Sequence, residues 1–187
     1  MALSTIDPTP ALLLVDLQKG LRNAPTVHPF DEVIDRAAEL AAAFRKHGLP
    51  VVLINVTGQA PGRTQSGRPG SQAHNPPADF ADLMEELDAQ DGDHRITKQT
   101  WGAFQNTKLD ALLRDLGVTQ VVVGGIATSL GVESTARSAY EHGYHVVLAT
   151  DAMTDVDPDV HLNSVERIFP RLGETATASE ILGLLGR

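Results

Sequence analysis

Two charged side chains stand at the ends of segments whose composition is typical of buried strands. Asp16 is the only charge in the apolar run 11–17, and Lys98 ends the short run 94–98. Open α/β sheets bind their ligands beyond the carboxyl ends of the strands. A carboxylate placed there can donate or accept a proton, and a neighbouring ammonium can hold or polarise a substrate. The simpler alternatives are that Asp16 caps a turn and that Lys98 lies on the surface.

A third candidate is the turn that follows the apolar, β-branched run 121–126. Gly and small hydroxyl residues fill this turn, and a helical pattern follows whose predicted buried face comprises Val132, Thr135, Ala136, Ala139 and Tyr140. The start of such a helix directs free N–H groups and its positive dipole end toward a ligand. We therefore expect the amides at Ala127 and the helix start to bind an anion or a developing negative charge.

The serines of this turn offer a different chemistry. Ser129 and Ser134 are alternative nucleophiles, but no partner base is evident for either of them in the sequence. Cysteine chemistry is excluded, because the chain contains no cysteine.

The turn resembles the signature of the isochorismatase-like hydrolases, a family that includes nicotinamidases and N-carbamoylsarcosine amidohydrolases. That signature reads Gly-Val-x-Thr-x-x-Cys-Val-x-x-Thr-Ala-x-x-Ala. Gly131 stands at the position of the cysteine, which is the nucleophile in most of the family. The resemblance suggests that true isochorismatases also carry Gly there and hydrolyse a vinyl ether by acid catalysis. The matching residues are Gly125, Ile126, Thr128, Val132, Thr135, Ala136 and Ala139.

Two further elements carry the same resemblance, which extends over residues 11–182. Residues 15–18, Val-Asp-Leu-Gln, look like a family element whose Asp is the catalytic acid or base, so Asp16 takes that role and Gln18 is expected to contact substrate. Residues 98–104 resemble a second element, whose lysine lies beside the catalytic Asp. Trp101 is then a pocket wall, with core packing as the alternative.

The turn itself also takes part in this resemblance. Relatives often have a non-proline cis peptide at the position of Ile126-Ala127. The resemblance therefore implies that Ile126 and Ala127 line the substrate site. It also implies that the protein is a homo-oligomer, a dimer or larger.

Residues 57–79 form a Gly-, Pro-, Ser- and Arg-rich stretch that is too long for an idle connector, so it is either a lid or a disordered segment. Arg63 and Arg68 are candidates to bind a substrate carboxylate, because guanidinium groups bind carboxylates in bidentate fashion. Two unremarkable arginines on a solvated loop are the alternative. Nicotinamidase-like relatives place an Asp-x-His and a second His near this region to bind a metal. This chain has Asn-Val-Thr at residues 55–57 and a lone His74, so we expect no metal and no cofactor.

Composition limits the class of partner. The chain has 187 residues, the size of one large domain spanning 1–187. Its 24 acidic and 15 basic residues give a formal charge of −9, which argues against nucleic acid or an anionic membrane and favours a small-molecule substrate. No stretch approaches the ~20 apolar residues of a membrane span. Residues 1–7 do not resemble a signal sequence, so a cytoplasmic location is the default expectation.

Strand patterns alternate with helical patterns along the chain. This alternation predicts a three-layer αβα, Rossmann-like fold around a mostly parallel sheet of about six strands. The remaining strands are expected at 51–56, 145–149 and 175–177. Helices are expected from Asp31 to His47, over 79–87, over 107–116, from Asp157-Pro158, and from the capping box Thr177–Glu180.

The sequence thus predicts a hydrolase that uses neither thiol nor metal. Asp16 supplies acid assistance, Lys98 supports it, and the leading substrate is isochorismate or another small carboxylated vinyl ether. One alternative is a family member that lost its chemistry and serves as a binding or assembly protein, and another is a hydrolase with a different nucleophile. Retention of both Asp16 and Lys98 argues against lost chemistry, because a buried ion pair costs several kcal/mol per charge before pairing.

Overall fold

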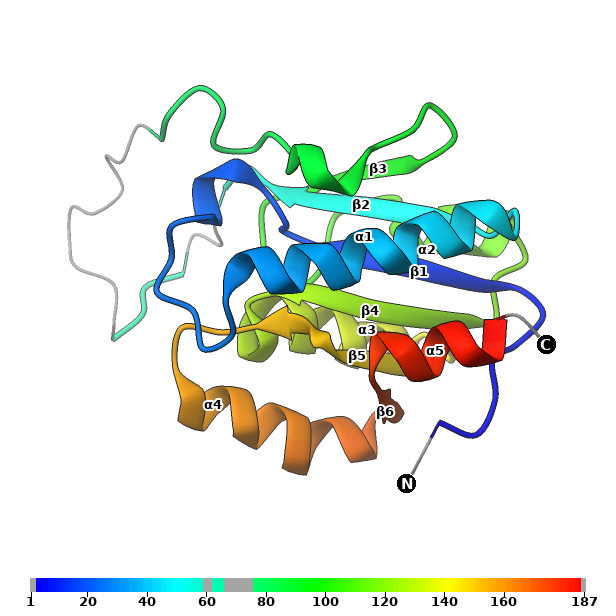
Figure 1. Cartoon of the computed structure of the whole chain (residues 1–187). Helices are drawn as coiled ribbons and strands as arrows, with labels where there is room; N and C mark the ends of the chain where they lie inside the picture. The colour runs from blue at the N-terminus through cyan, green and yellow to red at the C-terminus, as the bar shows by residue number, and fades with distance from the viewer. Residues whose placement is uncertain (1–2, 59–61, 66–75, 186–187) are drawn as a thin grey trace.

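The computed structural model describes residues 3–58, 62–65 and 76–185. Its centre is a six-stranded sheet in the order β3-β2-β1-β4-β5-β6, and every strand pair is parallel (Figure 1). The expected α/β fold class is therefore confirmed. The strands are β1 (Pro10–Val15), β2 (Val51–Val56), β3 (His94–Lys98), β4 (Gln120–Ile126), β5 (His145–Thr154) and β6 (Glu174–Ala176).

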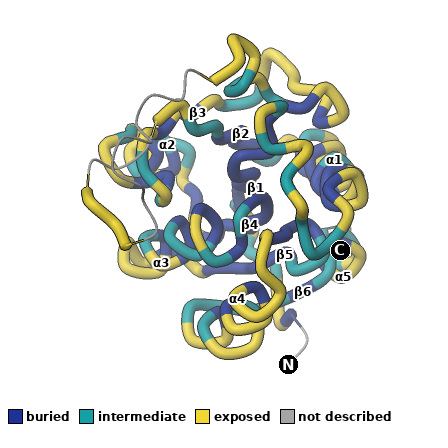
Figure 2. Tube along the Cα trace, turned by 90° about the vertical axis from the view of Figure 1, so that its left-hand side faces the viewer, coloured by how far each residue is buried: buried dark blue, intermediate teal, exposed yellow. Residues whose placement is uncertain are grey.

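Helices cover both faces of this sheet, as the view along the strands makes clear (Figure 2). On one side lie α1 (Phe30–Lys46) and α5 (Ala178–Leu185), and on the other lie α2 (Leu109–Asp115) and α3 (Glu133–Glu141). The short α4 (Pro158–Asn163) lies near the β6 end of the sheet. β1 serves both layers, because Leu12 and Leu14 join the core under α1 while Leu13 and Val15 join the core under α2 and α3.

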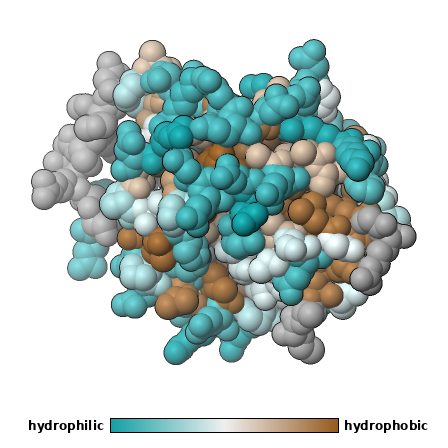
Figure 3. Space-filling view, in the orientation of Figure 1, coloured by the Kyte–Doolittle hydropathy of each residue, from teal (hydrophilic) through white to brown (hydrophobic). Residues whose placement is uncertain are grey.

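The outer surface reflects this layering. Hydrophilic side chains cover much of α1, and apolar side chains gather around α5 (Figure 3). Leu182, Leu184 and Leu185 of α5 are partly buried against the core. Among the described residues, no helix has the length and apolar character needed to cross a membrane.

Most predicted helix boundaries agree with the structure, with one shift. Helix α1 begins at Phe30 with Pro29 as its N-cap, so Asp31 lies in the first turn and is not the cap. An acidic side chain in the first turn still favours the helix through its dipole. The N-terminal caps of α4 and α5 are as expected. The Asp157 side chain accepts from the Asp159 amide at the start of α4, and Glu180 accepts from the Thr177 amide at the start of α5.

The predicted helix over 79–87 is wrong. Only Glu85–Leu87 is helical, as one 3₁₀ turn, and Leu83 instead pairs with Gln18 in an isolated antiparallel bridge. Backbone bonds hold this segment extended against the chain that follows β1, because Lys19 N donates to Asp82 O at 2.8 Å. Tertiary pairing outweighs the local amphipathic pattern here.

Two more expectations need correction. β5 continues to Thr154 and does not stop at Ala149, so it delivers Asp155 to the carboxyl edge of the sheet. Tyr140 was expected on the buried face of α3 but is 55% exposed, whereas the other four predicted positions of that face are buried.

Candidate active site

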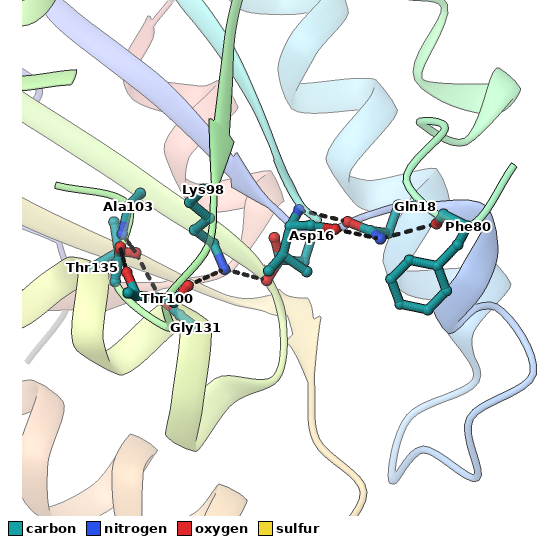
Figure 4. Close-up of polar contacts among 10 residues, drawn as sticks. Asp16, Gln18, Phe80, Lys98, Thr100, Ala103, Gly131 and Thr135 are labelled. Atoms are coloured by element: carbon teal, nitrogen blue, oxygen red, sulfur yellow. Dashed lines mark hydrogen bonds and ion pairs between the residues drawn. The ribbon is translucent and has the colours of Figure 1, made fainter. Parts of the chain in front are cut away.

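Asp16 and Lys98 meet across the carboxyl edge of the sheet. Asp16 follows β1 and Lys98 ends β3, and the lysine side chain reaches past the intervening β2. Lys98 Nζ donates to Asp16 Oδ2 at 2.6 Å and to Thr100 O at 3.0 Å (Figure 4). The two residues are only 5% and 2% exposed, respectively. The structure therefore brings these two predicted site residues together as a buried ion pair.

The Asp16 carboxyl group has one satisfied oxygen and one free oxygen. Oδ2 accepts from Lys98, whereas Oδ1 is buried and has no hydrogen-bond partner among the described residues. Burial raises the pKa of Asp16 to about 6, and the charge and hydrogen bond of Lys98 limit the rise. A carboxyl group with this pKa holds a proton in part of the molecules near neutral pH, as a general acid requires.

The backbone of Asp16 is fixed as firmly as its side chain. Its φ of 54° lies in the left-handed region, which non-glycine residues seldom adopt without support. That support comes from both sides, because Asp16 N donates to Ile54 O at 2.8 Å and Gln18 N donates to Asp16 O at 2.9 Å. The turn therefore points the carboxyl group away from the strand direction and toward Lys98 (Figure 4).

The Gln18 side chain, which was expected to contact substrate, is bonded to the protein backbone instead. Its side-chain Nε2 donates to Val56 O and Phe80 O, and its Oε1 accepts from Val56 N at 2.8 Å. All of these partners are backbone atoms, and the residue is fully buried. The geometry favours a role for Gln18 in fixing the chain after β1 against β2.

Gly131 lies directly against the Asp16 carboxylate. It belongs to the π-helical turn Thr128–Val132 that connects β4 to α3. A Cβ atom built on Gly131 would lie 3.2 Å from Asp16 Oδ2 and 3.1 Å from Val15 Cγ1. A side chain at this position would therefore face the ion pair. The cis peptide expected at Ile126-Ala127 is present.

The expected anion site at the helix start is wrong for three of its amides. Ser129 N donates to Asp155 Oδ2 at 2.7 Å, and the amides of Leu130 and Val132 donate to Ala127 O at 3.1 and 3.2 Å. A carboxylate of the protein itself occupies the place where an anion was expected. A substrate anion near Ser129 would find these N–H groups already bonded within the protein, and it would lie close to the Asp155 carboxylate.

Asp155 is the site residue that the sequence reasoning missed. It is 2% exposed, and its Oδ2 also accepts from Ser129 Oγ at 2.8 Å. The partner that Ser129 lacked in the sequence is therefore present in the structure. The sequence signal for Asp155 is its position directly after a strand, which Asp16 shares. The predicted strand 145–149 stops six residues before Asp155, so the prediction did not include it.

The buried His161 and the partly exposed His28 lie next to this turn. The Nδ1 atom of His161 lies 2.9 Å from Thr128 Oγ1, and its ring meets the ring of His28 edge-on. Burial, followed by the nearby His28, lowers the pKa of His161. This neutral, hydrogen-bonded environment agrees with a structural role for His161.

The outcome for the remaining predicted residues varies. Trp101 is 56% exposed, so its core-packing alternative is wrong, and a role as pocket wall stays a prediction. Arg63 is exposed, and Arg68 and His74 lie outside the described residues. Two surface grooves, of about 570 and 470 Å³, lie elsewhere, and neither is lined by Asp16 or Lys98.

The family's metal-binding position does not fit a metal in this chain. Asn55 stands there, and its amide is used by the protein, because Nδ2 donates to Ala81 O and Oδ1 accepts from Thr97 Oγ1, both at 2.8 Å. Over the described part of the chain, no three His, Cys, Asp or Glu side chains group together in a way that could hold a metal ion.

Comparisons with known proteins agree on one family. A family model described as the isochorismatase domain matches residues 10–180. The chain is 40% identical to an uncharacterized isochorismatase family protein, YecD, of Escherichia coli O157:H7, over 95% of this chain and 96% of the relative. It is 31% identical to the ureidoacrylate amidohydrolase RutB of Methylobacterium radiotolerans, over 97% and 83%. The solved structure of an isochorismatase family protein from Burkholderia thailandensis superposes with a TM-score of 0.90, at 39% identity and 98% coverage of both chains.

The ion pair gives a prediction about the Asp16 carboxyl group. Lys98 lowers the pKa of Asp16, so Lys98→Met should raise that pKa above its value of about 6. The shift can be followed by carbon NMR of labelled aspartate, with Asp16→Asn used to assign the signal. Lys19→Met is the matched control, since Lys19 pairs with Glu85 on the surface, and it should leave the Asp16 midpoint unchanged. A midpoint that stays near 6 in Lys98→Met contradicts the coupling.

Proposed function

Because the chain belongs to the isochorismatase family of hydrolases, we propose that it hydrolyses a small substrate by acid assistance from Asp16, without a thiol nucleophile and without a metal. The observation that carries this proposal is the Asp16 carboxyl group, which is buried, has a pKa raised to about 6, and has an Oδ1 atom without a partner in the part of the protein that the structure describes. An isochorismate-like vinyl ether that carries a carboxylate is the leading substrate class.

The chemistry of a vinyl ether suits one carboxylic acid. Asp16 gives its proton to the terminal carbon of the C=C bond, and the double-bond electrons form the new C–H bond. The adjacent carbon becomes an oxocarbenium ion, which the Asp16 carboxylate stabilises by its charge. Water adds to that carbon and gives one proton back to Asp16, which produces a hemiketal. As the C–O bond to the leaving group breaks, the remaining hydroxyl proton of the hemiketal passes to the leaving oxygen, so the products are a ketone and an alcohol. Lys98 stabilises the carboxylate while it lacks the proton.

Amide hydrolysis is the second candidate, because the relative RutB is an amidohydrolase. This route needs a nucleophile other than cysteine. Ser129 Oγ donates to the Asp155 carboxylate, but Asp155 also accepts from the Ser129 amide, so this contact fixes the turn as much as it activates a hydroxyl. Loss of chemistry is the least favoured alternative, since a buried ion pair is expensive to retain.

A substrate screen that compares isochorismate with small amides tests the proposal. We expect turnover of the vinyl ether in the presence of EDTA, and loss of turnover with retained binding in Asp16→Asn. The acid acts in its protonated form, so kcat/KM should fall as pH rises through about 6. Near-normal turnover by Asp16→Asn, or a loss of activity in EDTA that zinc restores, would contradict the proposal.

Gly131→Cys tests the location of the reacting group. The new sulfur would lie beside Asp16, so we expect reaction with iodoacetamide and slower vinyl ether hydrolysis, at a cost of about 1–3 kcal/mol in the free energy of unfolding. Gly131→Ala is the control, because it adds the Cβ atom without the thiol and should slow hydrolysis to a similar degree. A Gly131→Cys protein with unchanged hydrolysis and an unreactive thiol would place position 131 away from the site.

A homo-oligomer is proposed as the working form. Leu130, Val156 and Val160 are exposed apolar side chains on the site turn, after β5 and in α4. Exposed apolar groups of this kind often mark contact surfaces. Sedimentation at micromolar concentration should give a mass of at least twice 20.0 kDa, and a monomer would count against the proposal.

A further inference from the structure

Asp155 is a buried carboxylate that the proposed chemistry does not use. Among the described residues it accepts four hydrogen bonds, which join three separate segments of the chain. Its side chain accepts from Ser129 N, Ser129 Oγ and Val156 N, and its backbone O accepts from Val27 N at 2.8 Å. Over the described residues, Asp155 takes part in no salt bridge. Its charge is stabilised by these donors and by the start of the helical turn.

The turn that Asp155 holds is the one that bears Gly131. Ser129 lies two residues before Gly131, whose backbone lies against Asp16. On the other side of the turn, Gly131 O accepts from Thr135 Oγ1 at 2.7 Å, and Thr135 Oγ1 accepts from Ala103 N at 3.1 Å (Figure 4). The Thr135 contacts fix one side of the turn, and the Asp155 contacts fix the other.

A movement of this turn would change the surroundings of Asp16. The raised pKa of Asp16 is caused first by burial, and the Gly131 turn is one of the structures that bury it. Water that entered between Gly131 and Asp16 would restore solvation to the carboxylate and lower its pKa toward its ordinary value of 3.8. The position of the turn therefore bears on the protonation of the acid.

We propose that Asp155 is a positioning residue for the active site, which acts as an internal anion that holds the Ser129–Gly131 turn against Asp16. The proposal rests on the role proposed above for Asp16, but its contacts do not depend on the identity of the substrate. This role also explains why a carboxylate of the protein lies at the start of the helical turn, where substrate anions were expected to bind. Asp155 itself supplies the anion that accepts from the Ser129 amide and hydroxyl.

Asp155→Ala with formate rescue tests this role without any substrate. Removal of the carboxylate should release the turn, and the Asp16 midpoint, followed by carbon NMR of labelled aspartate, should fall by at least one pH unit from about 6. Formate should enter the vacated space and restore the midpoint, whereas chloride at equal ionic strength should not. Because this readout needs no turnover, it can fail while the proposed hydrolysis stands, and the reverse also holds.

Asp151→Ala is the matched control. Asp151 lies in β5, the strand that Asp155 follows, and accepts from an amide at a helix start, Ala178 N of α5 at 2.7 Å, but that helix carries no site residue. It should lose stability in urea without a change in the Asp16 midpoint. If Asp155→Ala does not fold, Asp155→Asn is used, which keeps the shape but only one acceptor oxygen, and the midpoint should move in the same direction. An Asp16 midpoint unchanged in the folded Asp155 variant, or unaffected by formate after it has fallen, would overturn the proposal.

Discussion

The burial of the Asp16–Lys98 ion pair is the constraint on which the rest of the site depends. Two charges removed from water cost several kcal/mol each, and a short contact with good geometry is needed to offset that cost. The 2.6 Å bond meets this need only because β1 and β3 hold the two residues on either side of β2. Lys98 donates to Oδ2 only, so among the described residues Oδ1 of Asp16 has no donor, and burial raises the pKa of the carboxyl group to about 6.

Two buried carboxylates at one edge of the sheet thus have different surroundings. Within the described part of the chain, Asp16 has one cationic partner and one oxygen without a donor, whereas the Asp155 side chain accepts from three donors. Environment, and not residue type, separates their roles, in the way that carboxylates of one active site often differ. Gly131 lies on the turn that Asp155 contacts, and because it has no side chain, this turn can approach the Asp16 carboxylate closely.

The fold was largely predictable, because buried parallel strands and amphipathic helices are local patterns. The strand predicted in the run 11–17 is found as Pro10–Val15, and the capping box at Thr177 is also present. The errors fell where long-range contacts decide the conformation. Leu83 pairs with Gln18, which is distant in the sequence, and this pairing has no local sequence signal. Strand β5 continues past the polar residues Thr150 and Asp151 to Thr154, although polar residues of this kind usually suggest that a strand ends.

The sequence by itself determined the chemistry that is available: no thiol, an Asp and a Lys at strand ends, and a Gly where relatives have a nucleophile. These facts depend only on residue types and on position along strands. The tertiary structure decided which donors remain free, since hydrogen bonds between distant segments commit Gln18 to the backbone and fill the helix start with Asp155. Burial and satisfaction of polar atoms depend on the packing of the whole chain. The raised pKa of Asp16 and the use of the Ser129, Leu130 and Val132 amides within the protein could therefore be learned only from the folded molecule.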